Sequence, residues 1–102
     1  MSQRRQPVLG ILGGGQLARM LALAAAPLGV KTLVVDSSAD ACAGQVTQLV
    51  VADWTDYAAL EAFAAQVDVV TFDFENVPAE TARWLAERVS VFPEPQIGRA
   101  HV

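Results

Sequence analysis

Short apolar runs rich in Val, Leu and Ile alternate along the chain with longer segments rich in Ala and Leu. The apolar runs predict strands at 7–12, 30–36, 47–51, 67–72 and 89–92. The segments between them predict helices at 16–28, 56–66 and from Pro78 to Arg88. Because strands alternate with helices, we expect an α/β fold with a Rossmann-like, doubly wound parallel sheet of about five strands.

The first predicted helix carries an apolar stripe, because large side chains recur at spacings of three and four residues. Gln16 and Arg19 lie outside this stripe, and Pro27 and Gly29 end the helix. The stripe consists of Leu17, Met20, Leu21, Ala24 and Leu28. For the second helix, the segment 53–55 supplies candidate N-caps, beginning with Asp53.

Composition indicates one compact domain. The chain has 102 residues, of which 53% are hydrophobic and 18% charged. Its first six residues are polar and no apolar run reaches the roughly 18 residues of a membrane span, so we expect a cytoplasmic protein that does not contact a membrane. We expect residues 1–6 to be a disordered segment and 7–96 to form the domain.

The formal net charge of −4 argues against nucleic-acid binding, which requires a basic surface that displaces counterions. The single cysteine, Cys42, excludes an internal disulfide and a multi-cysteine metal site. We expect Cys42 to be an ordinary small apolar residue and expect no metal site in this chain.

The last six residues, 97–102, differ from the rest of the chain. Their sequence, Ile-Gly-Arg-Ala-His-Val, looks like the translation of a widely used sequencing adapter up to its stop codon. We expect a non-native tail after Gln96. The alternative is a short natural linker.

Three consecutive glycines, Gly13 to Gly15, lie between the first predicted strand and the first helix. Glycines permit a sharp turn and let backbone N–H groups approach a ligand, and the helix amino end adds unpaired donors, so a phosphate would fit here. The spacing up to Ala18 also matches a loose dinucleotide fingerprint, with Asp36 in the place of a ribose-binding acid. A phosphate, NAD and a tight turn without ligand all stay open.

A second polar segment follows the fourth predicted strand, in residues 71–78. Ligands of open parallel sheets bind at the carboxyl ends of strands, so this segment should share an edge with the glycine loop. In extended geometry Asp73 and Glu75 point to one side and the two phenylalanine rings to the other. Carboxylates there suit a ligand with hydroxyl or amino donors. Alternatively, Asp73 and Asn76 cap the helix that begins near Pro78.

Two segments carry a family resemblance. Residues 10–21 are Gly-Ile-Leu-Gly-Gly-Gly-Gln-Leu-Ala-Arg-Met-Leu, and 71–78 are Thr-Phe-Asp-Phe-Glu-Asn-Val-Pro, with Asp36 and the Gly-Gln-Val of 44–46 between them. Together they resemble the amino-terminal, pre-ATP-grasp domain of the 5-(carboxyamino)imidazole ribonucleotide synthase (PurK) family, in the ATP-grasp superfamily. The resemblance covers roughly residues 8–96.

This resemblance implies an ATP-dependent ligase of de novo purine biosynthesis. The complete enzyme would carboxylate 5-aminoimidazole ribonucleotide with bicarbonate, through carboxyphosphate, and would be a homodimer. Because the family's ATP, magnesium and bicarbonate sites lie in later domains, this chain would hold part of the ribonucleotide site and no catalytic residue, and would be inactive alone. The substrate contacts that the resemblance implies, for the 5′-phosphate and for the amine and ribose hydroxyls, are Gly14, Gly15, Gln16, Leu17, Asp73, Glu75 and Asn76.

The chain departs from the family pattern at Ala18, usually glycine, and at Asp73, usually glutamate. The sequence leaves three other functions open. An NAD(P)-binding oxidoreductase domain fits the glycine spacing, but two acids near the pocket would repel a pyrophosphate. Another ATP-grasp ligase, such as a glycinamide ribonucleotide enzyme, is disfavoured by Gln16, Leu17 and the segment 76–78. No sequence feature favours a non-enzymatic interaction module.

Overall fold

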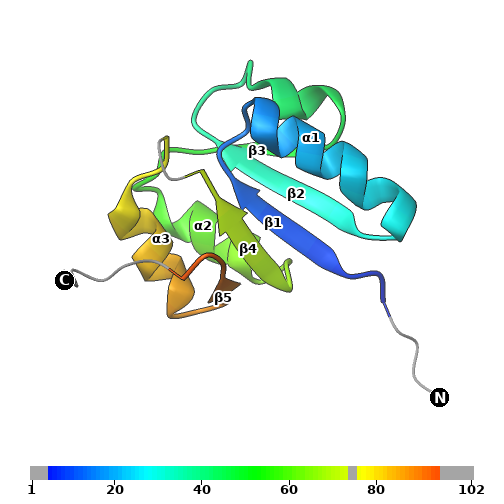
Figure 1. Cartoon of the computed structure of the whole chain (residues 1–102). Helices are drawn as coiled ribbons and strands as arrows, with labels where there is room; N and C mark the ends of the chain where they lie inside the picture. Colours follow the sequence, from blue (N-terminus) through cyan, green and yellow to red (C-terminus); the bar gives the residue numbers. More distant parts are fainter. Residues whose placement is uncertain (1–4, 74–75, 95–102) are drawn as a thin grey trace, which may run out of the picture.

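The structure, a computed structural model that describes residues 5–73 and 76–94, contains one five-stranded sheet with all strand pairs parallel (Figure 1). The strand order is β3-β2-β1-β4-β5, so β1 lies at the centre. The strands are β1 (Val8–Leu12), β2 (Lys31–Asp36), β3 (Gln48–Val51), β4 (Val69–Phe72) and β5 (Ser90–Val91). The predicted α/β fold with a parallel five-stranded sheet is confirmed.

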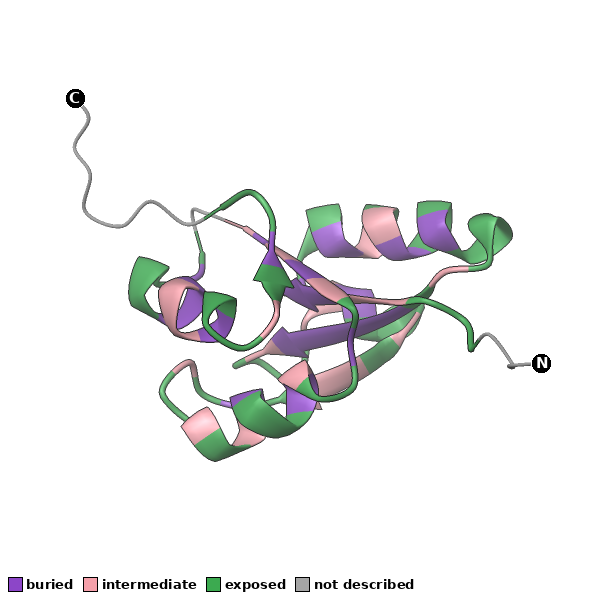
Figure 2. Ribbon diagram, turned by 90° about the horizontal axis from the view of Figure 1, so that it is seen from below, coloured by how far each residue is buried: buried purple, intermediate pink, exposed green. Residues whose placement is uncertain are grey.

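Helices lie on both faces of the sheet. Helix α1 lies on one face, and α2 and α3 lie on the other (Figures 1 and 2). The helical elements are α1 (Gln16–Ala25), η1 (Ala26–Leu28), η2 (Cys42–Gln45), α2 (Tyr57–Ala64) and α3 (Ala79–Ala86), where η1 and η2 are 3₁₀ turns. Within the described residues, none of these helices combines the length and the apolar character that crossing a bilayer requires.

The helix ends follow local chemistry. The first predicted helix is shorter than expected, because α1 ends at Ala25. Pro27 lies in the 3₁₀ turn η1 that follows, and Gly29, with a φ of 79°, ends that turn. The cap predicted within residues 53–55 is wrong, because the N-cap of α2 is Asp56. The side chain of Asp56 accepts a hydrogen bond from the Ala59 amide at 3.1 Å, while Asp53 accepts the Asp56 amide through its carbonyl.

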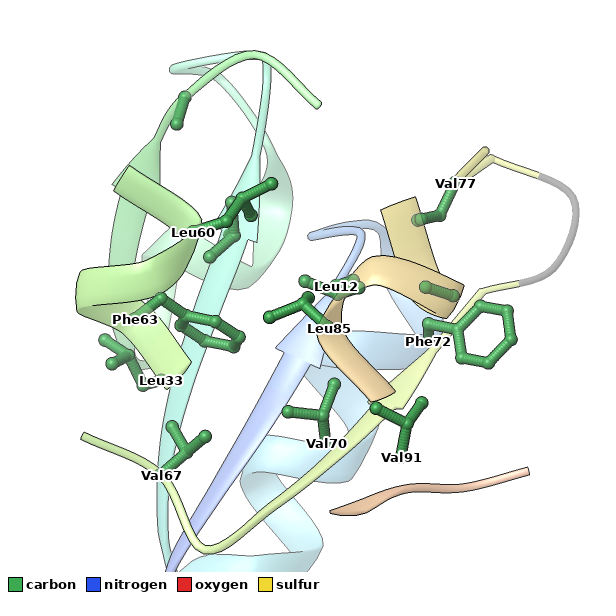
Figure 3. Close-up of a cluster of buried hydrophobic side chains, with 13 residues drawn as sticks. Leu12, Leu33, Leu60, Phe63, Val67, Val70, Phe72, Val77, Leu85 and Val91 are labelled. Atoms are coloured by element: carbon green, nitrogen blue, oxygen red, sulfur yellow. The ribbon is translucent and has the colours of Figure 1, made fainter. Parts of the chain in front are cut away.

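Two hydrophobic clusters fill the spaces between the sheet and its helices. The larger one lies between the sheet and α2 and α3, and includes Leu12, Phe63, Val70 and Leu85 (Figure 3). The smaller one lies under α1 and consists of Ile11, Ala18, Val34 and Ala43. Neighbouring residues of β1 therefore serve opposite faces, as the pleat of a strand requires.

The face that α1 presents to the sheet differs from the predicted stripe. Leu17, Met20 and Leu28 are 55%, 56% and 78% exposed, Ala24 is exposed and Leu21 is half-buried. The buried residues of the helix are Ala18, Ala22 and Ala25. Alanines at spacings of four and three form a second stripe, and their small size lets the helix backbone approach the sheet closely. Close packing therefore outweighs the larger apolar area of the leucine stripe.

Candidate functional site

The glycine loop and the polar segment after β4 meet at the carboxyl edge of the sheet. The chain leaves β1 through Gly13 and enters α1 on one face, whereas β4 is followed by α3 on the opposite face. Since β1 and β4 are neighbours, this is the point where the strand order reverses and where open α/β sheets bind ligands. The expected convergence is confirmed for Asp73 and Asn76, and Glu75 lies outside the described residues.

A pocket of about 360 Å³ opens at this edge. Its volume is in the range of sites for small molecules. The described residues that line it are Gly13, Gly15, Asp36, Ser37, Trp54, Asp73 and Asn76. It therefore brings together three of the predicted contacts, Gly15, Asp73 and Asn76.

Two other predicted contacts lie beside this pocket. Leu17 lines a small neighbouring hollow together with Gly13 and Asp73. The Gln16 side chain accepts a hydrogen bond from the Cys42 thiol, with 3.6 Å between Oε1 and Sγ. The backbone of both residues nevertheless belongs to the first turn of α1, next to the pocket.

The three glycines differ in what a side chain at each position would meet. Gly13 has a φ of 96°, a conformation that residues with a Cβ rarely adopt. A Cβ at Gly14 would lie 2.9 Å from the Cβ of Ala41, closer than atoms can pack. A Cβ at Gly15 would have no neighbour within 4 Å. The fold therefore requires the first two glycines, and the third leaves open space at the pocket.

Asp36, at the end of β2, holds the glycine loop by hydrogen bonds. Its Oδ2 accepts the Gly14 amide at 2.6 Å, and its Oδ1 accepts the Ser38 amide at 2.9 Å. The Gly13 amide donates to the Val35 carbonyl. Gly14 is thus engaged within the protein, and its role as a ligand contact stays a prediction. The donors offered to an anion are those of the first turn of α1, which has no side-chain cap.

Asp73 and Asn76 bind each other. The Asn76 Nδ2 donates to the Asp73 Oδ2 at 2.7 Å, and the amides of Asn76 and Val77 donate to the Asp73 carbonyl. Pro78 occupies the N-cap of α3. The alternative, that Asp73 and Asn76 cap this helix, is therefore not what the structure shows. Their paired side chains form part of the pocket wall instead.

Sequence reasoning missed Trp54 and Ser37, which both line the pocket. Ser37 follows β2 directly, and Trp54 lies in the turn after β3. The usable signal was strand direction: in a parallel sheet the segment after every strand reaches the same edge. The carbonyl of Trp54 accepts a hydrogen bond at 3.0 Å from Thr81 Oγ1, whose residue is 2% exposed.

The pocket is acidic. Its described lining contains the carboxyl groups of Asp36 and Asp73 and no basic side chain. A bound phosphate would therefore need a cation supplied from outside this lining, because carboxylates repel it. Between residues 5 and 94, leaving aside 74 and 75, no group of three or more His, Cys, Asp or Glu side chains is placed to hold a metal ion.

A larger hollow, about 630 Å³, lies near the amino ends of β1 and β4, beside Arg5 and Asp68. There Arg5 pairs with Asp68 at 2.6 Å, and the Val8 amide donates to the same carboxylate at 2.8 Å. The Val8 hydrogen bond, followed by Arg5, lowers the pKa of Asp68 below its ordinary value. Because its charged groups are already paired, and because ligands of such sheets bind at the opposite edge, we do not assign the site here.

The sequence matches the family described as the ribonucleotide synthetase preATP-grasp domain over residues 7–99. The N5-carboxyaminoimidazole ribonucleotide synthase of Pseudomonas aeruginosa is 47% identical over 88 residues, which are 86% of this chain and 24% of that protein. The crystal structure of N5-carboxyaminoimidazole ribonucleotide synthetase from Thermus thermophilus is 54% identical, with a TM-score of 0.79 over 83% of this chain and 24% of that one.

A third relative was solved with a nucleotide. N5-carboxyaminoimidazole synthetase from Staphylococcus aureus, complexed with ADP, is 35% identical, with a TM-score of 0.76 over 83% of this chain and 24% of that one. The chain spans only part of the curated relatives that it matches. It covers 9% of the length of a bifunctional purine synthesis protein and 24% of the Pseudomonas aeruginosa synthase.

Proposed function

Since the chain belongs to the family of ribonucleotide synthetase preATP-grasp domains, we propose that it is the ribonucleotide-binding, amino-terminal part of an ATP-dependent 5-(carboxyamino)imidazole ribonucleotide synthase. The observation that carries this proposal is the convergence of the glycine loop with Asp73 and Asn76 in one pocket at the switch point of the sheet. The similarity to synthases of this activity supports it.

In the proposed complex the ribonucleotide's 5′-phosphate lies at the amino end of α1. Gly15 opens the space for it, and the backbone amides of Gln16 and Leu17 donate to its oxygens. The carboxylate of Asp73 and the side-chain carbonyl oxygen of Asn76 accept from ribose hydroxyls or from the exocyclic amine. Glu75 belongs to the same proposal by its place in the sequence.

The remaining substrates belong to other parts of the proposed enzyme. ATP supplies the phosphoryl group that activates bicarbonate, and it would bind, with magnesium, in later domains. Those domains would also supply cations for the ribonucleotide phosphate, which the acidic pocket lacks. What this chain's residues do is bind and orient the ribonucleotide. A homodimeric, cytoplasmic enzyme stays part of the proposal.

The dinucleotide alternative is disfavoured by Asp36. In NAD-binding domains the corresponding acid accepts from a ribose hydroxyl. Here both oxygens of Asp36 already accept backbone amides, those of Gly14 and Ser38. The carboxylate of Asp73 in the same lining would also repel a pyrophosphate.

A nuclear magnetic resonance titration tests the proposal. With the 102-residue chain labelled with ¹⁵N, ribose 5-phosphate should shift the amides of Gly15, Gln16, Leu17 and Asn76, with a Kd of about 1 mM, roughly 4 kcal/mol. NADH in a parallel titration should cause no saturable shift. Shifts that are confined to other parts of the chain, or saturable NADH binding in the micromolar range, would overturn it.

A further inference from the structure

We infer that Trp54 is a specificity residue of the ribonucleotide site, whose indole ring contacts the heteroaromatic base of the ligand. This inference rests on the proposed function and deepens it, because it separates recognition of the base from recognition of the ribose phosphate. It is carried by where Trp54 lies and by how firmly its turn is held.

Trp54 is partly buried and has two environments. One side of the residue packs against the larger hydrophobic cluster beneath α2 and α3. Another side lines the pocket of about 360 Å³, which it shares with Gly15 and Asp73.

Hydrogen bonds hold the backbone of the turn that contains Trp54. Thr81, buried at 2% exposure in α3, donates its hydroxyl to the Trp54 carbonyl at 3.0 Å. The Asp56 amide donates to the Asp53 carbonyl, and Asp56 then caps α2. Because the Trp54 carbonyl is bonded to α3 and the turn leads directly into α2, the backbone at Trp54 is ordered before any ligand binds, which reduces the entropy lost on binding.

The chemistry of the pocket assigns the ring its contact. A ribonucleotide has an anionic phosphate, a polar ribose and a flat aromatic base. The first turn of α1 suits the phosphate, and the Asp73–Asn76 pair suits the hydroxyls or the amine. Among the described lining residues, Trp54 is the one with an aromatic side chain. Stacking on such a ring stabilises a bound base, so the base should strengthen binding about tenfold.

The chain's two tryptophans provide an internal control. Trp84 lies on α3, where its ring contacts Tyr57, with centroids 4.7 Å apart, and the guanidinium of Arg88. In a titration of the full 102-residue chain, 5-aminoimidazole ribonucleotide should shift the indole N–H signal of Trp54 and leave that of Trp84 in place. Ribose 5-phosphate should shift the loop amides with little effect on either indole.

Two variants separate contact from structure. Trp54→Leu keeps an apolar side chain without the aromatic face, and it should weaken the ribonucleotide about tenfold while leaving the Kd of ribose 5-phosphate unchanged. Trp54→Phe keeps an aromatic face and should retain most of the difference between the two ligands. Thermal unfolding of both variants checks that the fold is intact.

The outcomes are distinct. A tenfold preference for the ribonucleotide that Trp54→Leu removes supports the inference. Equal loss for both ligands, or a wild-type chain that binds both equally, overturns the base contact and leaves the proposed function standing. A wild-type chain that binds neither ligand overturns the proposed ribonucleotide site, and the role of Trp54 with it.

Discussion

At the scale of single residues, the three consecutive glycines separate requirements of the fold from requirements of the site. The positive φ of Gly13 and the contact of Gly14 with Ala41 exclude other residues for structural reasons. Gly15 has an extended backbone, with φ −82° and ψ −157°, and open space where its side chain would be. A methyl group there is compatible with the fold and occupies the place proposed for the phosphate.

Gly15→Ala should therefore weaken binding of ribose 5-phosphate at least tenfold, about 1.4 kcal/mol, with little change in the free energy of unfolding. The measurement is the Kd from amide shifts beside a urea unfolding curve. Gly29→Ala is the matched control. Since Gly29 has a φ of 79°, this change should cost about 1–2 kcal/mol of stability and leave the Kd unchanged. Normal binding by Gly15→Ala would place the phosphate elsewhere.

Asp68 gives a prediction for pH. Its pKa is lowered in the folded chain by the Val8 amide and by Arg5, so the unfolded state binds a proton more readily. Its stabilising contribution should be complete above about pH 4 and should be lost as the pH falls through the folded pKa. The free energies of unfolding of the wild type and Asp68→Asn should differ at about pH 7 and converge in acid. A difference that does not shrink as the pH falls would contradict this linkage.

At the scale of elements, the strand positions were predictable because short β-branched runs separated by glycine, proline and polar turns fit few other structures. The shared edge of Gly13 and Asp73 followed from the direction of parallel strands alone. The face of α1 was not predictable in the same way. Two stripes compete on that helix, and the choice between Ala22 and Met20 depends on how closely the backbone approaches Val34, which is a tertiary property.

The alanine face of α1 can be tested with one substitution at two sites. On this helix the side chain of Ala22 is buried against the sheet, whereas that of Ala24 is exposed to solvent. Ala22→Leu should overpack the contact with the sheet and lower the free energy of unfolding by about 1–3 kcal/mol. Ala24→Leu should change it by less than about 0.5 kcal/mol. Equal effects in urea unfolding would show that the helix is rotated from the position described.

The site was only partly predictable for a similar reason. Gly15, Asp73 and Asn76 could be placed because each follows a strand at the ligand-binding edge. Contacts between segments far apart in the chain decide two other features. These are the hydrogen bond from the Gly14 amide to Asp36 and the position of Trp54. No local pattern encodes such contacts, since they arise only when the strands pair.

At the scale of the whole molecule, the proposed function makes the pocket one side of a larger site. Its described lining is acidic, whereas phosphoryl transfer requires cations around the migrating group. We therefore expect the 102-residue chain alone to show no ATP hydrolysis and no carboxylation of the ribonucleotide, even where it binds the ligand. A phosphate-release assay with ATP, magnesium and bicarbonate measures this. Turnover above the buffer blank, in a preparation free of contaminating ATPase, would show that the proposed division of labour is wrong.

The central position of β1 has a consequence for biosynthesis. Its partner on one side, β2, ends at residue 36, whereas its partner on the other side, β4, ends at residue 72. At about 5–20 residues per second, the ribosome needs roughly 2–7 s to make the chain between those two points. During that interval one edge of β1 in the nascent chain has backbone N–H and C=O groups without partners. Unpaired strand edges are templates for pairing with other chains, so slow translation between residues 36 and 72 prolongs the period in which a growing chain can aggregate.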